Sequence, residues 1–262
     1  MKLQNIIETE YETVTGDEIK ELAGVSHSCV SDLLTLYQKE WDKDQKIPAN
    51  YTREDLTLYN QFSDAIKKSK ISYTKEDITA FSILLHQFEG SSILEKAGSM
   101  LTALIAVHQK ETNCEDEYLI ITNHLKEKID FISHTNSNAR IRVRGNCGDY
   151  AGPFGEGSLI IEGNCGSFLG GSMKNGYVEV FGNAENMIGY HLYSGKIIIH
   201  KNVNSVGNQM KGGHIIVKGN VTNHVGAEME GGRIDIEGTC KSFRHPKGME
   251  VYNRGKKVEG KK

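Results

Sequence analysis

Cysteine is the residue type in this 262-residue chain whose spacing first suggests chemistry. Cys147, Cys165 and Cys240 occupy one position of a repeating unit, so they could hold a metal ion or form a disulfide. The same position holds alanine or valine in the other units, so we interpret it as a small buried apolar site that a reduced thiol also fills. Five cysteines without a C-x-x-C pair are typical of a reduced, cytoplasmic protein.

The other reactive side chains form no catalytic or metal-binding motif. The ten histidines show no H-x-x-x-H spacing, and no G-x-S-x-G segment would position a nucleophilic serine. The glycine-rich loops lack the Lys-Ser/Thr step and the following helix of a phosphate-binding loop. We therefore expect no catalytic residue, no cofactor and no metal site, and a role that is not enzymatic.

Three arginines are candidates for docking a partner. Arg140, Arg142 and Arg144 alternate along one predicted strand and therefore share its outward face. A solvated face is the alternative interpretation. The net charge of −3 argues against a protein that chiefly binds nucleic acid or anionic membranes, and no apolar stretch is long enough to span a bilayer. We expect a protein partner or a homo-oligomer, and no membrane association.

Residues 21–34 offer a DNA-binding alternative. The sequence Glu-Leu-Ala-Gly-Val-Ser-His-Ser-Cys-Val-Ser-Asp-Leu-Leu resembles the helix-turn-helix of LacI-type repressors. The resemblance implies a turn at Gly24 and a recognition helix that begins at Ser28, with Ser28 and Ser31 facing DNA. That helix would carry Asp32 and no lysine or arginine between residues 28 and 37, which suits phosphate poorly. An ordinary helical hairpin within residues 15–41 is the favoured interpretation.

The elements that must position these residues change character along the chain. Residues 1–115 contain helix start signals, in which Thr52, Thr74 or Ser92 lies three residues before a carboxylate. Apolar residues then follow at helical spacing. Besides the pair of helices within residues 15–41, we predict three helices, near 53–69, 75–89 and 93–110.

A unit of 18 or 19 residues repeats through the second half of the chain. Each unit has two alternating apolar residues and then a Gly-Asn step or a variant of it, and these corner residues are Gly145, Asn146, Gly163, Asn164, Gly182, Asn183, Asn202, Gly219 and Asn220. A short fixed period without a helical pattern indicates stacked turns whose strands pair in parallel. Glycine allows tight corners, and stacked asparagine amides can hydrogen-bond along the stack.

The predicted fold class is therefore α+β. We expect a helical region over residues 1–115, followed over residues 116–262 by a right-handed parallel β-helix with a basic C-terminal tail. The repeat predicts a single-stranded solenoid of about five to six rungs.

The Gly-Asn steps, together with Met-x-x-Gly segments such as Met210 to Gly213, resemble the glycine-rich GXGXG family. That family includes the C-terminal β-helix of the glutamate synthase large subunit and the β-helical subunit of formylmethanofuran dehydrogenase. The resemblance implies a spacer and docking surface whose catalytic chemistry belongs to other domains or subunits. We therefore expect a non-catalytic scaffold or docking subunit. The first alternative is an accessory subunit of such a redox complex, and the second is a DNA-binding regulator.

Overall fold

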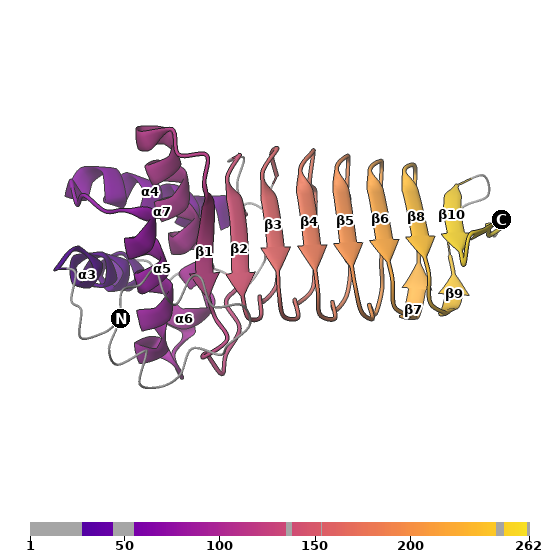
Figure 1. Ribbon diagram of the computed structural model, residues 1–262, viewed down its shortest axis with the longest axis horizontal. Helices are drawn as coiled ribbons and strands as arrows, with labels where there is room; N and C mark the ends of the chain where they lie inside the picture. The colour runs from indigo at the N-terminus through magenta and orange to yellow at the C-terminus, as the bar shows by residue number, and fades with distance from the viewer. Residues whose placement is uncertain (1–27, 44–54, 135–137, 153, 245–248, 261–262) are drawn as a thin grey trace.

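Two structural regions follow each other along one elongated molecule (Figure 1). The computed structural model describes residues 28–43, 55–134, 138–152, 154–244 and 249–260. Helices gather at one end, and parallel strands stack from there to the other end. This arrangement confirms the predicted order of a helical region followed by a parallel β-solenoid.

The described helices fall close to the predicted ranges. They are α3 (Ser28–Lys43), α4 (Asp55–Ser69), α5 (Lys75–Leu84), the 3₁₀ helix η1 (Leu85–Phe88), α6 (Ser92–Glu95) and α7 (Ala97–Thr112). The predicted capping box is present at α5, where Thr74 Oγ1 accepts from the backbone N–H of Asp77 and the Asp77 carboxylate accepts from that of Thr74. The first helix of the predicted pair, and Gly24 with it, lies outside the described residues.

Two predicted helices are less regular than their apolar spacing suggested. The helix predicted over residues 75–89 tightens into η1 at Leu85, and the one predicted over residues 93–110 is interrupted at Lys96. Tyr37 lies in the core of the helical region, where its ring is fully buried beside Phe62 and Phe81. Among the helices that the structure describes, none combines the length and the apolar composition needed to cross a bilayer.

Eight parallel strands form the long sheet of the solenoid. In spatial order they are β1 (Glu117–Ile121), β2 (Arg140–Arg144), β3 (Ser158–Ile161), β4 (Tyr177–Val180), β5 (Lys196–Ile199), β6 (His214–Val217), β8 (Arg233–Ile236) and β10 (Glu250–Asn253). Two shorter strand pairings complete the solenoid: β11 (Lys256–Lys257) returns antiparallel to β10, and β7 (Val221–Val225) pairs in parallel with β9 (Cys240–Phe243).

The solenoid is longer than predicted. Seven turns separate β1 from β10, where the sequence suggested about five to six rungs. The sequence repeat does not reveal the first and last strands, because neither is followed by a Gly-Asn step. Thr122 and Asn123 follow β1, and Arg254 follows β10. Both strands nevertheless pair in register with their neighbours, since hydrogen bonding needs only an extended backbone.

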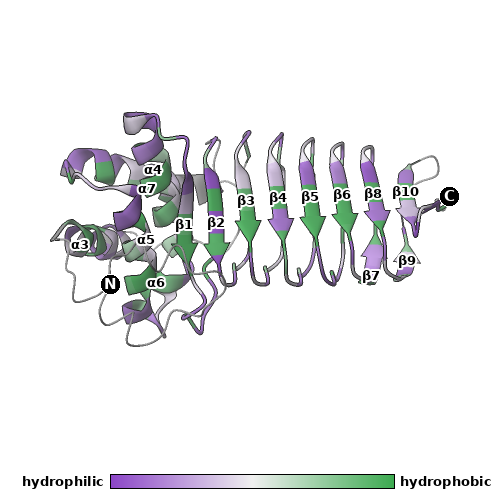
Figure 2. Cartoon of the chain, viewed as in Figure 1, coloured by the Kyte–Doolittle hydropathy of each residue, from purple (hydrophilic) through white to green (hydrophobic). Residues whose placement is uncertain are grey.

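The core of the solenoid consists of columns of aliphatic side chains. Figure 2 shows hydrophobic residues recurring in successive strands from β1 to β6. The first of the two alternating apolar positions of each repeat forms one such column, as the repeat predicts, because its members are buried and pair in register: Ile141, Leu159, Val178, Ile197, Ile215 and Ile234. Each such side chain contributes roughly 1.5–3 kcal/mol by leaving water.

Candidate functional site

The helical region caps the first turn of the solenoid. An uncovered β1 would expose a row of unpaired backbone groups, which is a template for aggregation. Two buried hydroxyls of α5 pair with that edge: Ser82 Oγ accepts from the Ile121 N–H at 3.0 Å, and Thr79 Oγ1 donates to the Leu119 carbonyl at 2.8 Å. The helix α5 therefore takes the place of a preceding strand.

The helix α7 extends this cap to the loop after β1. Thr102 Oγ1 accepts from the Ser133 N–H at 3.0 Å. Its proton points chiefly to the Gly98 carbonyl of the same helix at 2.6 Å, and the Phe131 carbonyl lies at 3.2 Å. A Cβ at Gly98 would lie 1.9 Å from the Asp130 carbonyl oxygen, so only glycine permits this approach. The contacts give the helical region a structural role that the sequence left open.

Two of the three candidate cysteines are buried as predicted. Cys147 and Cys165 are free thiols in the core, and burial raises the pKa of both, which makes them poor nucleophiles. The expectation that Cys240 is also buried is wrong, because β9 forms the outer edge of its sheet and leaves this residue half-buried. Within the described ranges, no three His, Cys, Asp or Glu side chains form a group that could hold a metal ion.

The three candidate arginines lie on the outward face of β2 and contact neighbouring strands. Arg142 pairs with Glu117 at 2.7 Å and with Glu162 at 3.5 Å. Arg144 also pairs with Glu162, at 3.7 Å. Arg140 donates to the Glu115 carbonyl. The geometry orders the three side chains, and their docking of a partner stays a prediction.

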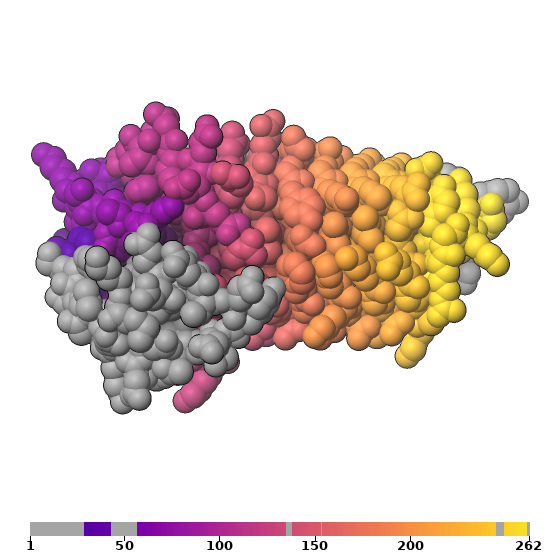
Figure 3. Space-filling model, in the orientation of Figure 1, coloured from indigo at the N-terminus to yellow at the C-terminus, as the bar shows by residue number. Residues whose placement is uncertain are grey.

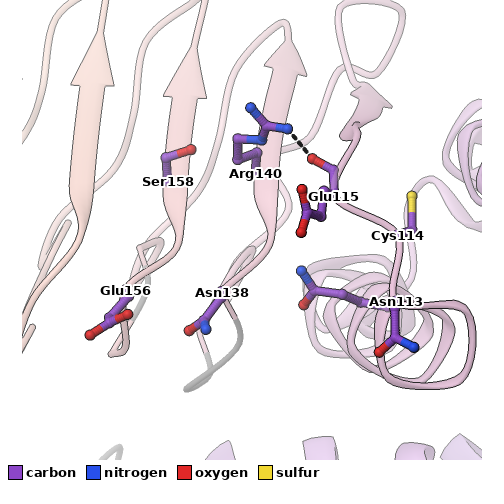
Figure 4. A pocket seen from close by; sticks show the side chains of 8 residues that line it. Asn113, Cys114, Glu115, Asn138, Arg140, Glu156 and Ser158 are labelled. Atoms are coloured by element: carbon purple, nitrogen blue, oxygen red, sulfur yellow. Dashed lines mark hydrogen bonds between the residues drawn. The ribbon is translucent and has the colours of Figure 1, made fainter.

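Polar groups line an open cleft of about 790 Å³ between the end of α7 and the first strands. Its lining residues are Gln109, Asn113, Cys114, Glu115, Asn138, Arg140, Glu156 and Ser158. Figure 4 shows the Arg140 guanidinium turned toward the Glu115 carbonyl. Arg140 is thus the predicted docking residue that reaches this cleft, which offers hydrogen bonding at the junction of cap and solenoid.

The largest candidate surface is the outward face of the long sheet from β2 to β8, which we call the outer sheet face. Side chains alternate between core and surface along each strand and into the residue that follows β3, β4, β5, β6 and β8, so each turn contributes three positions to this face. The first column is Arg140, Ser158, Tyr177, Lys196, His214 and Arg233, the second is Arg142, Ile160, Glu179, Ile198, Ile216 and Asp235, and the third is Arg144, Glu162, Phe181, His200, Lys218 and Glu237.

No described helix overlaps β4 to β8 in Figure 1, and Figure 3 shows these turns continuing as one long surface. On the outer sheet face, Ile160, Ile198 and Ile216 are half-buried, and Phe181 remains 41% exposed. The Phe181 ring stacks on His200 with 4.4 Å between ring centroids. Apolar side chains are thus set among charged ones on this face.

Histidine–carboxylate pairs order this face. Glu179 accepts from Tyr177 at 2.6 Å and lies 2.6 Å from His200 Nε2; although burial raises the pKa of Glu179, these hydrogen bonds lower it overall. Asp235 accepts two hydrogen bonds from Arg233 and lies 2.6 Å from His214 Nε2, and the arginine chiefly lowers its pKa. Both carboxylates are therefore ionised and occupied at neutral pH, which suits structure better than acid–base catalysis.

The predicted asparagine corner is a continuous ladder. Each side-chain oxygen accepts from a backbone N–H one turn further on, at 2.8–3.1 Å, from Asn146 through Asn164, Asn183, Asn202 and Asn220 to Thr239.

A second polar ladder was not predicted from the sequence. Its members connect successive turns in the order Asp130, Asp149, Ser167, Asn186, Asn204 and Thr222. Residue type changes at every step or two, so no repeated residue marked the ladder. The signal that could have found it is a position that is always able to hydrogen-bond, three or four residues after Gly145, Gly163, Gly182, Lys201 and Gly219.

The helix α3 begins at Ser28, as the helix-turn-helix resemblance implies. Ser31 and Asp32 are exposed on it, whereas Leu33 and Tyr37 point into the helical core. The exposed face therefore presents a carboxylate near its start, and DNA reading by Ser28 and Ser31 stays a prediction without support from charge.

Comparison with known protein families finds no family that matches the chain, and comparison with curated proteins finds no matching relative.

Proposed function

We propose that this protein is a non-catalytic scaffold that docks a protein partner on its outer sheet face. The observation that carries the proposal is the composition of that face: half-buried isoleucines and the exposed Phe181 lie among ordered ion pairs over six consecutive strands. A sheet whose strands are already paired in register loses little conformational entropy on binding, which favours docking.

The groups that could perform chemistry have structural partners instead. The thiols of Cys147 and Cys165 are buried, and the carboxylates of Glu179 and Asp235 are each held by two neighbours. The corner amides cap backbone N–H groups. This use of reactive side chains to join turns supports a scaffold over an enzyme.

The narrower proposal is a right-handed β-helix of the GXGXG family. The Gly-Asn corners support it, because they recur at every turn from β2 to β6 apart from the Lys201-Asn202 variant. Under that proposal the partner is an enzyme subunit of a redox complex of the glutamate synthase or formylmethanofuran dehydrogenase kind.

Quantitative co-purification from the native cell tests the docking role. Three tagged full-length chains are compared: wild type, Ile216→Asp on the outer sheet face, and Asn223→Asp on the exposed side of β7 as a matched control. We expect the same enriched partner with wild type and control, and its loss with Ile216→Asp. A redox-enzyme subunit as that partner supports the narrower proposal. Equal recovery with all three chains, or no enrichment of either a different protein or an untagged copy of this chain, contradicts docking on this face.

A further inference from the structure

When the outer sheet face is rotated by 180° and placed against an unrotated copy, most of its charged residues meet residues of opposite charge. We propose that this face pairs with the same face of a second copy, about a twofold axis parallel to the strands between β4 and β5. The inference rests on the proposed docking role and specifies its partner. A twofold interface uses one patch on both copies, so the patch must be self-complementary.

Strand register fixes which residues would face each other. The strands β2, β3, β4, β5, β6 and β8 pair without any offset, so each column runs straight across the sheet. The proposed axis reverses the order of strands and keeps each column opposite itself. It places β2 over β8 of the second copy, β3 over β6, and β4 over β5.

The third column is complementary at every position. Arg144 faces the second copy's Glu237, and Glu162 faces the second copy's Lys218. Each contact occurs twice because of the symmetry, giving four attractions between opposite charges. Complementary charges of this kind select the partner and fix its register.

The same column brings aromatic rings together at the axis. Phe181 faces the second copy's His200. Within each chain, the rings of Phe181 and His200 already stack on each other. Four rings, two from each copy, would then form one cluster. This arrangement covers Phe181, one of the two large hydrophobic side chains that are exposed in the described part of the chain.

The second column agrees with this pairing. Arg142 faces the second copy's Asp235, and Ile160 faces the second copy's Ile216. Glu179 faces the second copy's Ile198, but its carboxylate is already engaged by hydrogen bonds from its own chain. Opposite charges, an aliphatic contact and a carboxylate held by its own chain therefore follow one another along this column.

The first column is the weakest of the three. It sets Tyr177 against Lys196 and Ser158 against His214, but Arg140 would face Arg233. That repulsion is moderated because Arg233 is paired with Asp235 through two hydrogen bonds. Six extended segments about 4.8 Å apart, each taken as about five residues long to include the third column, give roughly 400 Å² of plane per copy. This area is below that of a standard interface, so we expect a weak dimer with a micromolar or higher dissociation constant.

A charge exchange between copies tests the pairing with full-length protein. In Lys218→Glu homodimers two glutamate pairs would repel, and in Glu162→Lys homodimers two lysine pairs would repel. Sedimentation velocity at rising concentration should show wild type dimerising and each variant associating at least about tenfold more weakly. An equimolar mixture of the two variants should recover dimers, because both contacts become attractive in the heterodimer.

A second pair of variants covers the case in which Glu162→Lys disturbs folding, since Glu162 also pairs with Arg142 and Arg144. Ile216→Asp should weaken the dimer at least about tenfold, whereas Asn223→Asp on β7 should leave it unchanged. A wild type that stays monomeric at the highest concentration overturns self-pairing, as does a dimer indifferent to Lys218→Glu and Ile216→Asp. Neither result contradicts the docking role, because that role is tested separately by co-purification with the Ile216→Asp and Asn223→Asp variants.

Discussion

At the scale of single residues, Asn164 shows why glycine precedes asparagine at the corners. Its backbone N–H donates to Asn146 Oδ1, and its own Oδ1 accepts from the Asn183 N–H. A Cβ at Gly163 would lie 2.6 Å from Asn146 Oδ1, so the glycine leaves the room that the amide of the preceding turn occupies. The two residues therefore act as one unit, which explains why they recur together.

This ladder could be predicted from the sequence because one residue type performs the task at each turn. The second polar ladder could not, because different atoms make its links: Asp149 and Ser167 accept from backbone N–H groups, whereas Asn186 accepts from the side-chain amide of Asn204. The Cys147 position was predictable for a third reason, since only small apolar side chains fit it in every turn.

Asp130 at the start of the second ladder should make stability depend on pH. Burial raises its pKa to about 6, although the Asp149 N–H donates to its Oδ1 and favours the charged form. In the unfolded chain the pKa of Asp130 is about 4. Between these values the folded state binds more protons, so the contribution of Asp130 to stability falls as the pH rises.

Asp130→Asn keeps the acceptor and removes the charge. We expect its advantage over wild type in free energy of unfolding to grow from about pH 4 to about pH 6 and then to level off. Burial lowers the pKa of His134 to about 4, which acts in the same range with the opposite sign, but it is common to both proteins and cancels in the difference. Urea denaturation at a series of pH values measures this difference, and a constant difference would contradict the assignment.

At the scale of elements, α5 behaves as a substitute strand at the end of the sheet. The sequence predicted its start, because the capping box at Thr74 is a local signal. The interruption at Lys96 was not predictable, because it depends on the loop that α7 meets: Asp130 donates its N–H to the Glu95 carbonyl, and Gly98 packs against Asp130. Contacts distant in sequence thus decide where these helices break.

Removing one cap hydroxyl tests this interpretation. Ser82→Ala leaves the buried N–H of Ile121 without its acceptor, so we expect a loss of about 1–3 kcal/mol in free energy of unfolding. Ser91→Ala is the matched control, because its hydroxyl is exposed and bonds only to the Phe88 carbonyl within the helical region. Chemical denaturation compares the two. Equal, small losses would show that α5 does not seal the sheet.

The helix α3 should not bind DNA. Its described exposed side chains include Asp32 at the start and Lys39 near the end, which provides little to neutralise phosphate. We expect no shift of random duplex DNA in a gel at about 50 mM salt, a condition that favours non-specific binding by true DNA readers. A retarded band that Ser28→Asp or Ser31→Asp abolishes would instead support the regulator hypothesis.

At the scale of the whole molecule, each turn contacts mainly the turns before and after it. The order of regions and the in-register columns follow from the repeat, whereas the number of turns does not, because the end strands β1 and β10 depart from the Gly-Asn pattern. Stability in such a stack is roughly a sum of neighbouring terms, so the ends decide where opening starts. Here the ends differ: helices seal β1, and the short β11 covers part of β10.

Hydrogen exchange of the native protein should therefore reveal a polarity along the solenoid. We expect amides of β9 and β10 to exchange first, amides of β4 to β6 to exchange last, and those of β1 to be nearly as protected as those of β2. In Ser82→Ala, protection should fall at β1 and β2 while β8 and β10 stay unchanged, because the added opening begins at the damaged cap. Ser91→Ala should reproduce the wild-type pattern. Mass spectrometry of labelled fragments resolves these regions, and equal protection of all strands in wild type would show that the solenoid opens as a single unit rather than turn by turn.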